Sequence, residues 1–204
     1  MFNRRQFLVG SGAAWASLAL LGNQAFAQRL PSITEVQYDP DIPVLGNPLG
    51  DVTIVEYFDY QCTYCRTGHA DLMRVVKDDG NIRLILKDWI IFGETSAYAS
   101  RLVLATENLG DYEKAVEALM KATGQLNRDR VKELLAQAGL DPEKLETRFR
   151  DNATHINNIL SRNMDQAEAF NFVGTPAFIV GTKVYGGVMR HTDLVQAVRE
   201  ARKA

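Results

Sequence analysis

Two cysteines three positions apart are the feature that most constrains this chain. Cys62 and Cys65 are the only cysteines, and they lie in FDYQCTYCRTGHADLMRVV, where an apolar run suited to a strand gives way to helical spacing. A thiol at the start of a helix faces free backbone N–H groups and the positive end of the helix dipole, which favour the thiolate. The sequence therefore predicts a redox pair at a strand-to-helix junction.

Two structural roles compete with the redox interpretation, and both are weaker. A bridge across so short a loop stabilises a fold by only roughly 2 kcal/mol, against about 4.7 kcal/mol for a loop of 100 residues. A closed zinc site needs four Cys or His ligands, and the chain has no second pair of cysteines. Because His69, His155 and His191 have no ligand cluster beside them in the sequence, we expect surface or helix-terminal roles for them and no metal site.

Residues 1–27 have the pattern of a cleavable export signal. The basic stretch MFNRRQ precedes an apolar segment with small residues, and Ala25-Phe26-Ala27 is a typical cleavage site. The stretch NRRQFL is similar to a twin-arginine signal, with general secretion as the alternative route. We expect cleavage after Ala27 and a periplasmic protein, in a compartment where disulfides persist.

Hydrophobic periodicity divides the rest of the chain into one α/β domain. The four prolines of residues 28–50 indicate an extended segment with at most one short strand, and the domain follows over 51–204. Its expected order is strand 52–58, helix 62–76, strand 81–86, a helical insertion at about 95–170, strands 176–180 and 183–188, and a final helix after 192. The formal net charge of −2, without a basic stripe, argues against a nucleic-acid partner.

This order resembles the thioredoxin fold and, more narrowly, the DsbA-like thiol:disulfide oxidoreductases with a helical insertion. DPDIPVLGNPLGDVTIVEYFDYQCTYC is similar to the stretch that leads into the family's active site, and VGTPAFIVGTKVYGG is similar to its cis-proline hairpin. The resemblance implies a βαβ unit, a helical insertion and a ββα unit around a central mixed sheet. It also implies no cofactor other than the Cys62–Cys65 disulfide.

The resemblance assigns roles to several residues near the cysteines. Cys62 is expected to be the exposed sulfur that meets the substrate, and Cys65 the buried resolving thiol. Glu56, six positions before Cys62, is the expected buried acid that exchanges a proton with Cys65; the alternative is a strand residue facing solvent. Lys87 is the expected partner of Glu56, against the alternative of an ordinary exposed lysine.

Two further pairs of residues are expected to bind substrate or tune the site. Pro176 is the expected cis-proline and Thr175 the residue whose backbone pairs with a substrate strand, the alternative being a trans proline at an edge strand. Thr63 and Tyr64 stand between the cysteines, and Tyr64 occupies the position where strong oxidants of the family often carry histidine. We therefore expect an oxidant milder than the strongest members.

Taken together, these residues predict a periplasmic enzyme that donates disulfides to exported proteins with cysteines. A reductase or isomerase of the same fold is the first alternative, and a soft-metal protein that holds Cu(I) between the two thiolates is the second. The expected protein is a monomer that depends on a membrane redox partner for recycling.

Overall fold

The computed structural model describes residues 31–204, so the predicted export signal at 1–27 lies outside the described residues. The strands of the described chain are β1 (Val44–Gly46), β2 (Val52–Phe58), β3 (Ile82–Asp88), β4 (Ala177–Val180) and β5 (Lys183–Gly186). Its helices are α1 (Ile33–Gln37), α2 (Thr63–Asp79), α3 (Glu94–Leu104), α4 (Leu109–Met120), α5 (Arg128–Gln137), α6 (Pro142–Asp151), α7 (Ala153–Ala169) and α8 (His191–Ala201).

The strands form one mixed sheet in the order β1-β3-β2-β4-β5. β2 and β3 run parallel and are joined through α2, whereas the other neighbouring pairs are antiparallel. Helices α3 to α7 follow β3 without a strand between them, and the β4–β5 hairpin and α8 complete the fold. The predicted mixed sheet and the order βαβ, helical insertion, ββα are confirmed.

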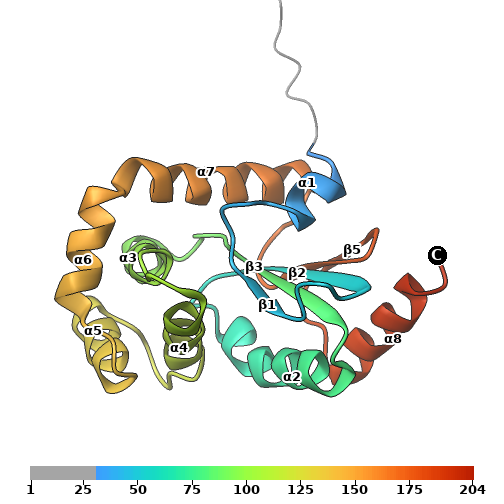
Figure 1. Ribbon diagram of the computed structural model, residues 1–204, viewed down its shortest axis with the longest axis horizontal. Helices are drawn as coiled ribbons and strands as arrows, with labels where there is room; N and C mark the ends of the chain where they lie inside the picture. The colour runs from blue at the N-terminus through green and yellow to red at the C-terminus, as the bar shows by residue number, and fades with distance from the viewer. Residues whose placement is uncertain (1–30) are drawn as a thin grey trace, which may run out of the picture.

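Helices cover both faces of the central strands. Figure 1 shows α1 and α7 on one side of the sheet, α2 and α8 on the other, and α3 to α6 grouped beyond one end. Every residue of β2 and of β3 is buried as a result. Strands covered on both faces are near-continuous apolar runs, which is how these two segments read in the sequence.

Strand register decides which side chains face the cysteines. Ile54 and Phe58 of β2 belong to the same core cluster as Cys62 and Cys65, on the α2 side of the sheet. Tyr57 belongs to the opposite cluster, beside α1 and α7. Because side chains alternate along a strand and partners in register point the same way, each residue of β3 takes the side of its partner on β2.

The segment before β2 is more regular than the sequence indicates. We expected an extended stretch with at most one short strand, but the structure has both α1 and β1. The helix begins with a capping box, in which the Ser32 hydroxyl accepts from the backbone N–H of Glu35 and the Glu35 carboxylate accepts from that of Ser32. The S-x-x-E spacing in SITE is the signal for it. No helix within residues 31–204 is long and apolar enough to cross a membrane.

Candidate active site

The sulfur of Cys62 lies at the start of α2 because Cys62 is the N-cap residue of that helix. Its backbone is extended, with φ −68° and ψ 114°, and its Sγ accepts a hydrogen bond from the backbone N–H of Cys65 at 3.3 Å. From the other side, Sγ lies 3.3 Å from the carbonyl oxygen of Thr175, to which Cys62 donates a hydrogen bond in its thiol form. The N-cap position therefore turns the sulfur toward the unpaired donors of the helix.

These surroundings favour the thiolate form of Cys62. Its pKa is lowered from 9.0 to about 6, above all because the thiolate accepts a hydrogen bond from the Cys65 thiol. Burial opposes this change, while the Thr175 side chain and the backbone N–H groups of Cys65 and Tyr64 add to it. At neutral pH the sulfur of Cys62 is therefore mostly an anion, the nucleophilic form of a thiol.

Cys65 has the opposite environment. It is completely buried, and burial is the main reason why its pKa is raised; the hydrogen bond to Cys62 and the nearby Glu56 carboxylate raise it further. Both cysteines are free thiols in this structure. The pair is thus asymmetric, with a stabilised thiolate at Cys62 and a protonated thiol at Cys65.

The expectation that Cys62 is exposed is wrong for this state of the protein. Only 2% of Cys62 is accessible, whereas 65% of Tyr64 is. The sulfur is turned inward by its two hydrogen bonds, to the amide of Cys65 and to the Thr175 carbonyl, and the aromatic ring two positions later faces solvent instead.

Glu56 lies beneath the cysteines on β2. It is buried, on the face of the sheet that carries α2. Burial raises the pKa of Glu56 to about 8, and the charge on Cys62 adds to the rise. Its Oε2 has no hydrogen-bond partner among the described residues. The structure excludes the solvent-facing alternative, while the role of Glu56 as a proton carrier stays a prediction.

Lys87 does not accompany Glu56, so that expectation is wrong. The residue of β3 in register with Glu56 is Leu86, whereas Lys87 is in register with Tyr57 and takes the opposite face of the sheet. There the buried Lys87 ammonium donates to Asp39 Oδ2 at 2.6 Å. The alternative expectation, that Lys87 is an ordinary exposed lysine, is also wrong, because α1, α7 and the segment between α1 and β1 cover that face.

The segment that ends in Thr175 and Pro176 faces the start of α2 and leads into β4. The peptide bond between these two residues is cis, as the resemblance implies. The backbone carbonyl of Thr175 contacts Cys62, and its buried hydroxyl makes no hydrogen bond of ordinary geometry. The structure thus brings together Cys62, Cys65, Glu56 and Thr175, from α2, β2 and the end of the helical insertion.

Residues 39–200 match the thioredoxin family. The chain belongs to the thioredoxin family. Its sequence is 38% identical to a thioredoxin-like oxidoreductase from Silicibacter pomeroyi DSS-3, whose crystal structure superimposes with a TM-score of 0.81 and covers 85% of this chain and 99% of that one. The predicted resemblance is therefore confirmed at the level of family and fold.

Two other proteins are similar to this chain, one in fold and one in sequence. The thiol-disulfide exchange protein α-DsbA2 from Wolbachia pipientis has the same fold, with 24% identity, a TM-score of 0.76, and coverage of 82% of this chain and 90% of that one. The Na(+)/H(+) antiporter NhaA of Herminiimonas arsenicoxydans is 29% identical over 213 residues, or 98% of this chain and 33% of that protein. The chain spans less than two thirds of the length of the curated relatives it matches.

Asp59 is a buried residue near the cysteines that the sequence did not single out. Its buried carboxylate accepts four hydrogen bonds: Oδ1 from Gln61 N at 2.8 Å and Ser96 Oγ at 2.6 Å, and Oδ2 from Ile91 N at 2.9 Å and Phe92 N at 3.1 Å. These bonds tie the loop that leads to the cysteines to the loop after β3 and to α3. An Asp two positions before the amide it binds is the usual Asx turn, and this local signal is present in DYQC.

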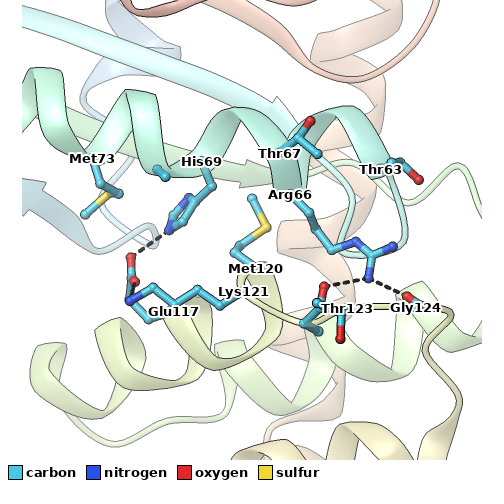
Figure 2. Close-up of a pocket in the computed structure, with 12 residues that line it drawn as sticks. Thr63, Arg66, Thr67, His69, Met73, Glu117, Met120, Lys121, Thr123 and Gly124 are labelled. Atoms are coloured by element: carbon cyan, nitrogen blue, oxygen red, sulfur yellow. Dashed lines mark hydrogen bonds and ion pairs between the residues drawn. The ribbon is translucent and has the colours of Figure 1, made fainter.

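The expectation that His69 has a surface or helix-terminal role is also wrong. It is buried on the face of α2 toward α4, and its Nε2 lies 2.6 Å from Glu117 Oε1. The contact with His69 is the main reason why the pKa of Glu117 is lowered to about 2. The pair lines a cavity of about 630 Å³ that also reaches Thr63 at the start of α2. Figure 2 shows the His69 and Glu117 side chains pointing toward each other from α2 and α4.

Metal-binding geometry is absent from the part of the chain that the structure describes. Within residues 31–204, no three His, Cys, Asp or Glu side chains are placed to hold an ion. This finding concerns clusters of three or more such ligands.

Proposed function

We propose that this protein exchanges disulfides with exported, cysteine-containing proteins and acts as a disulfide donor. The observation that carries the proposal is the opposite protonation of Cys62 and Cys65. Hydrogen bonds lower the pKa of Cys62 to about 6, while burial raises that of Cys65. A stabilised Cys62 thiolate makes the reduced protein a favoured product, which is the property of an oxidant.

The reaction follows from this asymmetry. A substrate thiolate attacks Sγ of Cys62 in the oxidised protein, and the Cys62–Cys65 bond breaks with its electron pair on Cys65. Glu56, which holds a proton at neutral pH, protonates the Cys65 sulfur. A second substrate thiolate then attacks the substrate sulfur of the mixed disulfide, and Cys62 leaves as a thiolate. The substrate loses two electrons and the cysteine pair gains them.

Substrate is proposed to bind beside Thr175. The carbonyl of Thr175 lies 3.3 Å from the reactive sulfur, at the point where the chain enters β4. An extended substrate strand that pairs with this backbone places its own cysteine against Cys62. Main-chain pairing of this kind does not depend on the substrate sequence, which suits an enzyme with many exported substrates.

Thr63 and Tyr64 are proposed to set a moderate redox strength. Tyr64 contributes its backbone N–H to the Cys62 thiolate, but its exposed side chain brings no positive charge. A charged donor makes a stronger hydrogen bond to a thiolate than a neutral one does. The protein is therefore proposed to be a milder oxidant than relatives with histidine at this position.

The export pattern of residues 1–27 supports a periplasmic location, and the proposed monomer is reoxidised there by a membrane redox partner. A reductase or isomerase uses the same residues with electrons flowing the other way. A copper carrier uses the two thiolates but has no need of a strand-pairing segment beside them. These alternatives differ in redox potential and in the state of the cysteines in cells.

The deciding experiment is the equilibrium potential against glutathione, together with the oxidation state of the pair trapped by alkylation in intact cells. We expect a potential between about −180 and about −120 mV, the range from protein disulfide isomerase to the strongest oxidants, with the pair oxidised in cells. A potential near about −270 mV and a dithiol in cells would mean a reductase. A pair found loaded with copper in cells would mean a metal carrier.

A further inference from the structure

A hollow of about 510 Å³ lies beside the reactive cysteine, between the start of α2 and the helical insertion. Its lining includes Gln61 and Thr63, the residues on either side of Cys62, together with Arg66, which follows one turn later in α2. The segment between α4 and α5 forms the opposite wall. No step of the proposed disulfide exchange uses this hollow.

Arg66 reaches from α2 to the helical insertion. Its Nη1 donates to two backbone carbonyls of the segment after α4, to Ala122 O at 3.1 Å and to Gly124 O at 2.7 Å. Figure 2 shows the Arg66 side chain extending from α2 toward this segment, with Thr63 nearer the start of the helix. Because two backbone acceptors already hold the guanidinium in place, it loses little conformational freedom when it binds a further group.

The charge of Arg66 is not neutralised within residues 31–204. Both of its acceptors are neutral carbonyls, and no carboxylate of these residues forms an ion pair with it. Its Nη2 makes no hydrogen bond with them and, unlike Nε, is not buried. The exposed side chains of Thr63 and Gln125 also have no hydrogen-bond partner in the described part of the chain. The hollow therefore offers a fixed cation and two neutral polar groups, and its lining contains no acid.

A carboxylate is the group that fits this arrangement. The planar guanidinium of arginine binds carboxylates through its N–H donors, and these charge-assisted hydrogen bonds are stronger than those between neutral groups. The hydroxyl of Thr63 and the amide of Gln125 are further donors on the same lining. Since Gln61 and Thr63 flank Cys62, a group in this hollow lies next to the reacting sulfur.

The separation of Arg66 from Cys62 indicates which substrate residue reaches it. Four positions along a helix correspond to a rise of about 6 Å. In an extended substrate chain, side chains two positions apart point the same way and lie about 7 Å apart. A substrate that presents its cysteine to Cys62 therefore has the side chain two positions away at a distance that matches Arg66.

We propose that Arg66 selects substrates with an acidic side chain two positions from the reacting cysteine. The substrate carboxylate enters the hollow and accepts a hydrogen bond from Nη2 of Arg66. Arg66 contacts no sulfur, so it determines specificity and leaves the path of electrons through Cys62 and Cys65 unchanged. The preference adds to main-chain pairing beside Thr175, and it rests on the proposed function because it concerns the substrate of the same exchange.

The test compares two peptides that the oxidised protein converts from dithiol to disulfide. In one peptide each of the two cysteines has Glu two positions before and two positions after it, and in the other peptide these positions are Gln. Each rate constant is divided by that of the same peptide with hydroxyethyl disulfide, a small neutral disulfide, which removes the effect of the carboxylates on the peptide thiols. We expect the wild-type protein to prefer the Glu peptide by about threefold to fivefold at low salt, the upper part of the range for an exposed ion pair.

Two variants that each remove one positive charge form the matched comparison. Arg66→Gln retains an amide that can donate to the carbonyls of the segment after α4, and it is expected to react equally with both peptides. Lys121→Gln removes an exposed charge at the end of α4 that does not line this hollow, and it is expected to keep the wild-type preference. If Arg66 had only a structural role, Arg66→Gln would slow both peptides by the same factor and the preference would remain.

Salt gives a second measurement that needs no variant, so it remains available if Arg66→Gln does not fold. The wild-type preference should decline between about 0.02 M and about 0.5 M sodium chloride, because salt screens an exposed ion pair. Equal normalised rates for the two peptides, a preference that does not change with salt, or an unchanged preference in folded Arg66→Gln would overturn the proposal. If the wild type oxidises neither peptide, the proposed function fails; if it oxidises both equally, only the role of Arg66 fails.

Discussion

At the scale of single residues, a separation of three positions is enough to give two cysteines opposite chemistry. The sulfur of Cys62 faces the backbone N–H groups at the start of α2, whereas the sulfur of Cys65 is buried in the core near the Glu56 carboxyl. The C-x-x-C spacing at the start of a helix predicts which of the two thiols has the lower pKa. It does not predict that the Cys62 sulfur is turned inward, because that depends on the Thr175 carbonyl, 113 positions away in the chain.

Glu56 gives a residue-scale prediction with a defined sign. Unfolded, its carboxyl releases a proton near pH 4.5; folded, it holds the proton until about pH 8 because it is buried. Between these values the unfolded state binds fewer protons, so the free energy of unfolding falls as pH rises. We expect Glu56→Gln to raise the free energy of unfolding by about 3 kcal/mol at pH 7 and to leave it almost unchanged at pH 4.

Urea unfolding of both reduced proteins at the two pH values is the measurement. The comparison at pH 4 is the internal control, because wild-type Glu56 is then neutral in the folded protein, like the glutamine. A glutamine variant that is less stable than wild type at pH 7 would show that the carboxylate is stabilised in the fold, contrary to its buried and unpaired position.

At the scale of elements, the alternating side chains of β3 serve two different faces of the sheet. Leu86 and Asp88 face the cysteine side of the sheet, and Lys87 faces the α7 side. The sequence predicts a strand here, starting at Asn81 instead of Ile82, but it cannot fix the register with β2. That register is decided by packing on both faces of the sheet. Lys87 could contact Glu56 only if β3 were shifted by one residue against β2, which would turn the Lys87 side chain to the other face.

Lys87→Met is expected to weaken the fold without changing the redox pair. Removing one partner of a buried ion pair leaves a buried charge on Asp39, at a cost of about 3 kcal/mol, the lower end of the usual range because Arg162 still contacts Asp39. The pH dependence of Cys62 alkylation should not move. Lys183→Met, which breaks an exposed pair with Glu200, is the control and should lose no measurable stability. A shifted alkylation profile in Lys87→Met would return Lys87 to the active site.

Asp59 connects the loop before α2, the loop after β3 and helix α3, so its loss should weaken the contacts among these three segments. Asp59→Ala removes the buried carboxylate that accepts from the backbone amides of Ile91 and Phe92 and from the Ser96 hydroxyl, so we expect a loss of about 2–4 kcal/mol in the free energy of unfolding. Hydrogen exchange of these two amides should become faster. Asp111→Ala, which removes a partly exposed carboxylate on α4, is the control. Unchanged protection of both amides in Asp59→Ala would contradict the role of Asp59.

At the scale of the whole molecule, the chain brings distant segments to one sulfur. The order of strands and helices was predictable because the periodic segments are long and the hairpin after Pro176 is marked by its turn residues. The contacts of the helical insertion were not predictable. The pairing of His69 with Glu117 arises only when α4 packs beside α2.

Cys62 is the sulfur proposed to meet the substrate, and this assignment can be tested directly. The direct test uses Cys65→Ala and Cys62→Ala, each mixed with a test peptide that contains one disulfide, and follows the protein–peptide mixed disulfide by mass spectrometry from pH 4 to pH 9. We expect Cys65→Ala to form a mixed disulfide through Cys62 at a rate that rises with pH through the thiolate titration, and Cys62→Ala to react at least about 100-fold more slowly, because its remaining thiol is buried and protonated. Equal rates for the two variants would contradict the claim.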